Sequence, residues 1–310
     1  MLSVCTGIYR DAISLEIFVR SLFGNASNPK DIELIIYNDE GHIETEQVLN
    51  SLTLEFPQIK HFVITKNERI DFFMERIEFY KKENIFEKDI INDMYKQVEM
   101  YKADKTKNLW YSPGRVYNKA IHKATGDMLM ILPSDYLIFF DATKIYELAK
   151  KLKPIVGHFD WIDFSSVDFD VLIDFSPVHS DVIKEFKKFN CHNDFRNLSR
   201  KWLDRAKKRG LITVPLQHGS RIIDRETFEK VGSFDERWFL RAVADDEFNR
   251  KVSNHSSLTR LGDNSQFEEL MPYIGCIRQK DYQLPFYLTS FYVASATVHS
   301  KFLDKIRPYL

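Results

Sequence analysis

Apolar runs and amphipathic segments alternate along the first 65 residues of the chain. Short apolar runs at Leu2–Tyr9, Ile32–Tyr37 and His61–Thr65 are typical of buried strands. Segments with helical spacing, Ile13–Leu22 and Thr45–Leu54, separate them. A β-α-β-α-β order with few charges in each strand is typical of a parallel sheet that helices cover on both faces. The sequence therefore predicts an α/β fold.

A long charged stretch interrupts this pattern after the third strand. Within it, apolar residues recur at the spacing of one helix face: Ile90, Met94, Val98 and Tyr101. We therefore predict a helical insertion at 68–111. The alternation then resumes with a helix near Arg115–Lys123 and an apolar strand at Met128–Leu132, which indicates that the sheet continues beyond the insertion.

Composition and charge exclude several classes of protein. Lys and Arg number 44 against 45 Asp and Glu, and a net charge of -1 gives no bulk reason to expect nucleic-acid binding. None of the 11 glycines falls in the spacing of a dinucleotide fingerprint or a P-loop. The cysteines Cys5, Cys191 and Cys276 show no zinc-site spacing, and no apolar stretch predicts a signal peptide or a membrane span. We expect a cytoplasmic protein and leave open a peripheral association with a membrane.

Polar residues follow three of the apolar runs. The first strand runs into Thr6-Gly7-Ile8-Tyr9-Arg10, the second into Asn38-Asp39-Glu40, and the strand at Met128–Leu132 into Ser134-Asp135. Ligands bind at the carboxyl ends of the strands in an open parallel sheet. We therefore expect these residues to line a ligand site.

Short motifs follow one another in a recognisable order along the chain. In sequence order they are Leu2-Ser3-Val4-Cys5-Thr6, Ile35-Ile36-Tyr37-Asn38-Asp39-Glu40-Gly41, Asn118-Lys119-Ala120-Ile121, Ala124-Thr125-Gly126-Asp127, Ile131-Leu132-Pro133-Ser134-Asp135, Val231-Gly232-Ser233-Phe234-Asp235-Glu236 and Ala244-Asp245-Asp246-Glu247-Phe248. This order resembles that of the family 2-like glycosyltransferases with the glycosyltransferase A-type fold. The resemblance covers 1–67 and 112–253.

The resemblance implies a fold and a division of the chain. The implied fold is a single mainly parallel sheet flanked by helices, the nucleotide-sugar-binding glycosyltransferase A-type fold, with a helical insertion and a C-terminal extension. The catalytic domain would span 1–253, with 68–111 as the insertion. Residues 254–310 would form an extension packed on it.

The resemblance also implies a donor site for a nucleotide sugar. The Asp39 carboxylate can accept a hydrogen bond from a uracil imide N–H, and Thr6 and Tyr9 would form the neighbouring wall. Donor-binding roles are implied as well for Arg115, Asn118 and Ser134. For Asp39 the alternative is an ordinary turn residue, since Asn-Asp-Glu-Gly is typical of turns.

A divalent metal would neutralise the diphosphate leaving group. The family holds this metal with an Asp-x-Asp motif, and here the aligned residues are Pro133-Ser134-Asp135. Asp135 is the one carboxylate left, and the resemblance implies that it binds Mn²⁺ or Mg²⁺. The alternative is a strand-end carboxylate that only water solvates.

A carboxylate is the usual base that removes the proton of an acceptor hydroxyl. Asp245 aligns with the family's catalytic aspartate, although Ala244 replaces the glutamate before it. Asp246 takes the role if the motif is shifted by one residue. The alternative is that both aspartates only supply favourable negative charge at a helix N-terminus.

We therefore predict an enzyme, a glycosyltransferase of the hexosyltransferase type. It would move a sugar from a UDP-linked donor to an acceptor hydroxyl with inversion, and the acceptor can be a glycan, a lipid-linked molecule or a protein. One alternative is a catalytically silent glycosyltransferase-like binding module, because Pro133 and Ala244 replace two motif acids. The other is a nucleotidyltransferase, which usually opens with a Gly-rich loop that this chain lacks.

Overall fold

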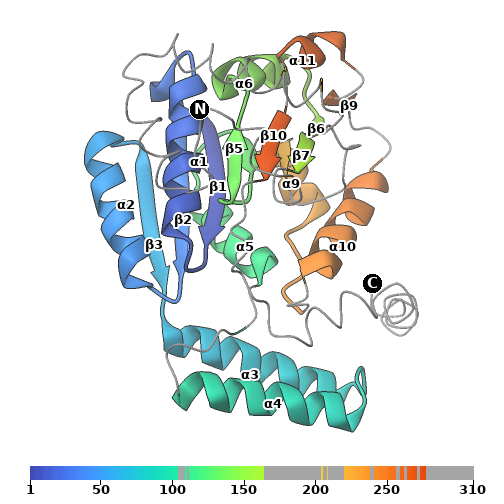
Figure 1. Ribbon diagram of the computed structural model, residues 1–310. Coiled ribbons are helices and arrows are strands. Elements are labelled where there is room, and N and C mark those ends of the chain that lie inside the picture. Colours follow the sequence, from blue (N-terminus) through green and yellow to red (C-terminus); the bar gives the residue numbers. More distant parts are fainter. Residues whose placement is uncertain are drawn as a thin grey trace.

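A twisted sheet with helices on both faces forms the centre of the computed structural model (Figure 1). The structure describes residues 1–103, 109, 112–163, 204, 208, 220–237, 241–255, 259–261, 264–270 and 273–276. No helix in this part of the chain is long and apolar enough to span a membrane.

The main sheet has seven strands among the described residues, in the order β3-β2-β1-β4-β8-β6-β9. They are β1 (Leu2–Ile8), β2 (Ile32–Asp39), β3 (Ile59–Ile64), β4 (Met128–Ile131), β6 (Ile155–His158), β8 (Arg221–Asp224) and β9 (Thr259–Arg260). Neighbouring strands run parallel except at β8, which is antiparallel to both β4 and β6. This arrangement confirms the predicted α/β class with a mainly parallel sheet.

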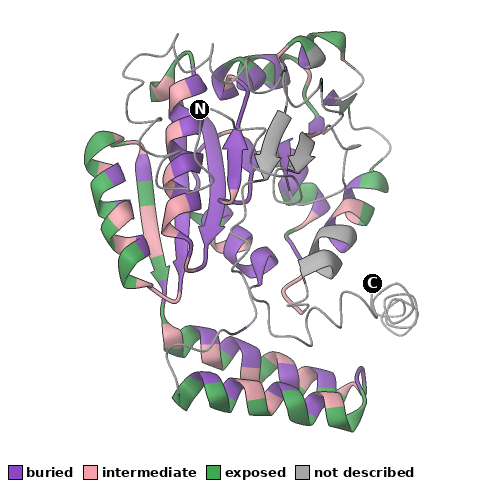
Figure 2. Ribbon diagram, viewed as in Figure 1, coloured by how far each residue is buried: buried purple, intermediate pink, exposed green. Residues whose placement is uncertain are grey.

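Helices cover the sheet and extend beyond it. They are α1 (Ala12–Asn25), the 3₁₀ turn η1 (Pro29–Asp31), α2 (Ile43–Glu55), α3 (Lys66–Lys82), α4 (Lys88–Ala103), α5 (Pro113–Lys123), α6 (Ala142–Lys151), α9 (Arg225–Val231), α10 (Arg241–Ser253) and α11 (Ser265–Glu269). Side chains of α1, α2 and α6 pack on one face of the sheet, and those of α5, α9 and α10 pack on the other. Figure 2 shows the consequence, since the central strands are buried and the outer helix faces are exposed.

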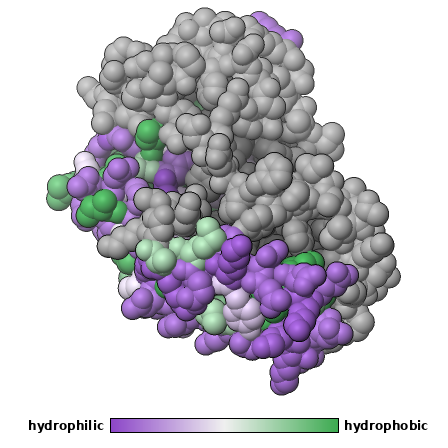
Figure 3. Space-filling view, turned by 60° about the horizontal axis from the view of Figure 1, so that its bottom comes forward, coloured by the Kyte–Doolittle hydropathy of each residue, from purple (hydrophilic) through white to green (hydrophobic). Residues whose placement is uncertain are grey.

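The predicted helical insertion is a hairpin of α3 and α4 below the sheet (Figure 1). A capping box of Thr65 and Glu68 begins α3 directly after β3. The hairpin has its own apolar core, in which Phe73, Tyr80 and Val98 are almost fully buried. Its outer surface is mostly hydrophilic (Figure 3).

A second, smaller sheet adds to the predicted single sheet. It has the order β5-β10-β7 among the described residues, and its strands are β5 (Tyr136–Ile138), β7 (Asp160–Asp163) and β10 (Tyr273–Cys276). β10 lies in the predicted extension at 254–310, and so does β9 of the main sheet. These parts of the extension therefore complete the sheets, while 277–310 lie outside the described residues.

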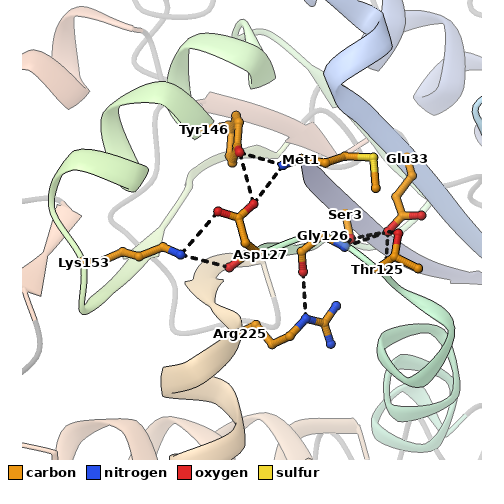
Figure 4. Close-up of polar contacts among 9 residues, drawn as sticks. All are labelled: Met1, Ser3, Glu33, Thr125, Gly126, Asp127, Tyr146, Lys153 and Arg225. Carbon is orange, nitrogen blue, oxygen red and sulfur yellow. Dashed lines mark hydrogen bonds and ion pairs between the residues drawn. The ribbon is translucent and has the colours of Figure 1, made fainter.

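The Thr125-Gly126-Asp127 turn ties strands together at the amino ends of β1 and β4 (Figure 4). The buried Glu33 carboxylate accepts hydrogen bonds from the Ser3 hydroxyl and from the Gly126 N–H at 3.0 Å. A Cβ at Gly126 would lie 2.4 Å from the Met1 carbonyl oxygen, so only glycine fits this close approach. This edge lies opposite the carboxyl ends, and we assign it to stability.

Replacing Glu33 by glutamine is expected to lower the free energy of unfolding by about 3 kcal/mol at pH 7. Burial alone would raise the pKa of Glu33, but hydrogen bonds from Lys60, Ser3 and Thr125 hold it at about 2. Because this pKa lies below the usual 4.5, the stabilisation is complete above pH 4.5 and is lost as the pH falls toward 2. Urea unfolding at pH 7 and at pH 3 measures the difference between the two proteins.

The exposed Glu226 on α9 supplies the matched control, since its partner Lys230 is exposed as well. Glu226→Gln should change the free energy of unfolding by less than about 1 kcal/mol at either pH. An equal loss at pH 7 and pH 3 for Glu33→Gln would contradict the proposed charge effect.

Candidate functional site

The carboxyl ends of β1, β2 and β4 lie side by side because these strands are parallel neighbours. β8 runs the other way, so its first residue, Arg221, pairs with Ile131 at the end of β4. This edge of the sheet therefore gathers the polar residues that follow the strands. It is the edge at which the sequence predicted a ligand site.

Asp39 ends β2 and forms a buried ion pair with Arg69 of α3. The two side chains are 2% and 1% exposed, and the second terminal nitrogen of Arg69 donates to the Leu109 carbonyl at 2.8 Å. Burial alone would lower the pKa of Arg69, but Asp39 and two tyrosines outweigh it and raise this pKa. Arg69 thus stays charged beside Asp39.

Tyr9 lies against the same guanidinium. Its ring centroid is 4.2 Å from the central carbon of Arg69, a cation–π contact, and its hydroxyl accepts a hydrogen bond from the Leu109 N–H at 3.3 Å. The predicted wall residue and the predicted base-reading residue therefore meet, and Arg69 of the insertion joins them.

Further charges surround this cluster. Arg10 forms an ion pair with Glu40 at 2.6 Å next to Asp39. Arg115 of α5 is close enough to Asp39 and Arg69 for charge interactions, and burial lowers its pKa. Three arginines thus lie around Asp39, and Glu236 and Glu68 also lie near Arg115.

Arg115 also contacts α3 of the insertion. Its guanidinium donates to the Glu68 carbonyl at 3.2 Å and lies 4.4 Å from the centre of the Phe72 ring. The predicted donor-binding arginine therefore helps to hold α3 against α5.

Several buried oxygens at this side of the molecule have no hydrogen-bond partner within the described part of the chain. They are Thr6 Oγ1, Asp39 Oδ1, Ser112 Oγ and Ser220 Oγ. Thr6 lies on β1, Ser112 is the N-cap residue of α5, and Ser220 directly precedes β8. A buried oxygen without a partner costs free energy, and a polar ligand can supply the missing bond.

Ser134 and Asp135 follow β4 as predicted. The Ser134 hydroxyl donates to the Gly7 carbonyl at 2.8 Å, so this side chain joins the ends of β1 and β4. Asp135 is half-buried beside it. Among the described residues, no three His, Cys, Asp or Glu side chains are grouped to hold a metal ion.

Asn118 of α5 makes its hydrogen bonds with the loop after α9. Its amide donates to the Phe234 carbonyl at 2.9 Å and to Glu236 at 2.8 Å, and its oxygen accepts from the Phe234 N–H at 3.0 Å. Asn118 therefore holds the loop after α9. Its donor-binding role stays a prediction.

Both predicted catalytic residues lie on α10, and the side chains of Asp245 and Asp246 are outside the described residues. The next residue, Glu247, is buried and forms an ion pair with Lys251 at 2.9 Å. Lys251 also donates to the Ser233 carbonyl at 2.9 Å, so α10 is bound to the loop that precedes it.

Arg69 is the site residue that sequence reasoning missed. A signal was present, since Arg69 shares one helix face with Phe72, Phe73, Ile77 and Tyr80, the buried residues of α3. A charged residue within an apolar stripe indicates a buried partner, because an unpaired buried charge is very costly.

Compared with the known protein families and with curated proteins, the sequence has no match. Among solved structures, the chain is similar to S. aureus TarS 1-349 in complex with UDP-GlcNAc, with 12% identity and a TM-score of 0.49 over 90% of this chain and 59% of that one. It is also similar to the mannosyltransferase PcManGT from Pyrobaculum calidifontis in complex with GDP-Man and Mn²⁺, with 13% identity and a TM-score of 0.45 over 91% and 58%.

A third similar structure is M. tuberculosis glucosyl-3-phosphoglycerate synthase, with 11% identity and a TM-score of 0.44 over 98% of this chain and 80% of that one. The chain thus spans less than two thirds of the length of the first two proteins. The likeness is one of fold, and the ligands and reactions in these names belong to those proteins.

Proposed function

We propose that this protein is a glycosyltransferase that takes its sugar from a nucleotide-linked donor, with UDP as the nucleotide. The observation that carries the proposal is the Oδ1 of Asp39 at the carboxyl end of β2, which is buried and has no hydrogen-bond partner among the described residues. Arg69 holds the other oxygen of this carboxylate, so Oδ1 is left as an acceptor for an N–H group such as the uracil imide.

The charges around Asp39 support the diphosphate part of the proposal. Arg10, Arg69 and Arg115 lie around Asp39, and arginine matches phosphate geometry well. A nucleoside diphosphate supplies both an N–H donor for Asp39 Oδ1 and negative charge for the arginines.

Thermal unfolding with a panel of nucleotides and nucleotide sugars tests the proposal. A ligand at about 100 times its dissociation constant stabilises the folded state by about 2.7 kcal/mol. We expect UDP and UDP-sugars to raise the unfolding temperature more than ADP or GDP. Equal effects for all nucleotides would contradict the proposed role of Asp39 as acceptor for the uracil N–H.

Asp135 is the residue that would hold a divalent metal in this proposal. Mg²⁺ is often bound by one or two carboxylates together with substrate phosphates and water, so a single carboxylate fits when a diphosphate is present. The bound ion would neutralise the leaving diphosphate.

Chelation with EDTA is therefore expected to remove most of the UDP-dependent stabilisation, and Asp135→Asn should have the same effect in the presence of Mn²⁺. Titration calorimetry with UDP measures both. Asp93→Asn, on the exposed side of α4, is the control and should bind UDP as the unmodified protein does. If EDTA leaves the UDP affinity unchanged, the arginines carry the diphosphate without a metal.

A silent binding module is the second candidate, because Pro133 and Ala244 replace two acids of the family motifs. Measuring the release of UDP from UDP-glucose or UDP-GlcNAc in the presence of Mn²⁺ distinguishes the glycosyltransferase from the silent module. Slow turnover with water as acceptor favours the enzyme, and binding without any turnover favours the module.

A further inference from the structure

Two of the contacts between the α3–α4 hairpin and the rest of the protein lie at distant points of α3. Near its beginning, Arg69 pairs with Asp39 at the end of β2. Eleven residues later, the Tyr80 hydroxyl donates to the Arg237 carbonyl at 2.7 Å. One helix therefore spans from the nucleoside end of the proposed site to the loop after α9.

The geometry of α3 makes these two contacts parts of one rigid arrangement. Eleven residues are about three helical turns, so Arg69 and Tyr80 project from the same face about 16 Å apart. Both are almost fully buried, at 1% exposure each. The hairpin core, with Tyr80 packed edge-on against Phe86 at 5.2 Å, keeps this face in place.

The loop that Tyr80 holds, Gly232–Arg237, leads directly into α10. Asn118 of α5 fixes Phe234 within it, and Lys251 of α10 fixes Ser233. Tyr80 adds a third point at Arg237, four residues before α10 begins. The loop before α10 is thereby connected to β2 through α3.

We propose that Tyr80 is a positioning residue for sugar transfer: through the Arg237 carbonyl it sets the place of α10, and with it Asp245, relative to the bound nucleotide. The inference rests on the proposed function. The α3–α4 hairpin then holds α10, which carries Asp245, at a fixed position relative to Asp39 on β2. Loss of the hydroxyl should affect the chemical step and leave nucleotide binding unchanged.

Tyr80→Phe is the test, and Tyr95→Phe is its matched control. The Tyr95 hydroxyl also makes a hydrogen bond from the hairpin, but it donates to Glu78 within the hairpin itself. With UDP-GlcNAc as donor and water as acceptor, we expect Tyr80→Phe to lower kcat for UDP release about three- to tenfold, as for one lost hydrogen bond. KM and the UDP affinity should stay the same, and Tyr95→Phe should change neither.

Hydrogen exchange gives a second readout that needs no turnover. Amides of Gly232–Arg237 should exchange faster in Tyr80→Phe than in Tyr95→Phe. An unchanged kcat, an equal loss in both variants or unchanged exchange in the loop would overturn the role of Tyr80. If the unmodified protein neither binds UDP nor releases it from UDP-sugars, the proposed function falls and this inference falls with it.

Discussion

Replacing Asp245 by asparagine is expected to lower the release of UDP from a UDP-sugar by at least about a hundredfold. A carboxylate that acts as general base contributes about 10²–10⁴-fold to rate, and an amide cannot accept the proton. The affinity for UDP should not change, because the proposed function assigns nucleotide binding to Asp39 on β2 and not to α10. Steady-state kinetics with calorimetry of UDP binding measures both quantities.

Asp246→Asn is the control for this experiment, and it should lower turnover much less. α10 begins at Arg241 and has no acidic residue in its first turn, so the helix-end explanation of both aspartates is weak. If Asp246→Asn is the damaging change, the motif is shifted by one residue. If neither change affects turnover, the silent binding module is the better account.

The local elements of this fold could be predicted from the sequence because their signals are local. Asp141 is of a residue type that favours helix N-caps, and its carboxylate accepts from the N–H groups of Thr143 and Lys144 at the start of α6. The alternation of strands and helices likewise depends on neighbours in sequence, and it predicted the α/β class correctly.

Pairings between distant segments could not be predicted in the same way. Two consecutive strands separated by Phe159 belong to different sheets, β6 to the main sheet and β7 to the small one. β10 lies between β5 and β7, far from both in sequence. The predicted helix boundaries carry no information about such partners.

The same limit applies to the site. Tyr9 and Asp39 were predicted from strand ends, because parallel strands end at one edge of the sheet. Arg69 was not predicted, since the hairpin was treated as an insertion separate from the site. The position of the Arg69 side chain depends on how α3 packs at the carboxyl end of β2. The spacing of apolar residues within α3 does not show this packing.

The buried pair of Asp39 and Arg69 leads to a second large effect, on stability. Asp39→Asn and Arg69→Met are each expected to lower the free energy of unfolding by about 3–5 kcal/mol, because each leaves a buried partner uncompensated. The double variant should lose clearly less than the sum of the two, since it leaves no buried charge unpaired. Urea unfolding of the four proteins gives the interaction energy.

The exposed pair of Glu226 and Lys230 provides the control cycle, and its interaction energy should be at most about 1 kcal/mol. Measuring the UDP affinity of the same four proteins shows whether each substitution changes ligand binding as well as stability. Asp39→Asn should weaken UDP binding even under conditions in which it is fully folded, because it loses the charged acceptor at Oδ1. Losses that simply add in the Asp39 and Arg69 cycle would show that the two side chains act independently, and the insertion would then contribute nothing to the base-reading carboxylate.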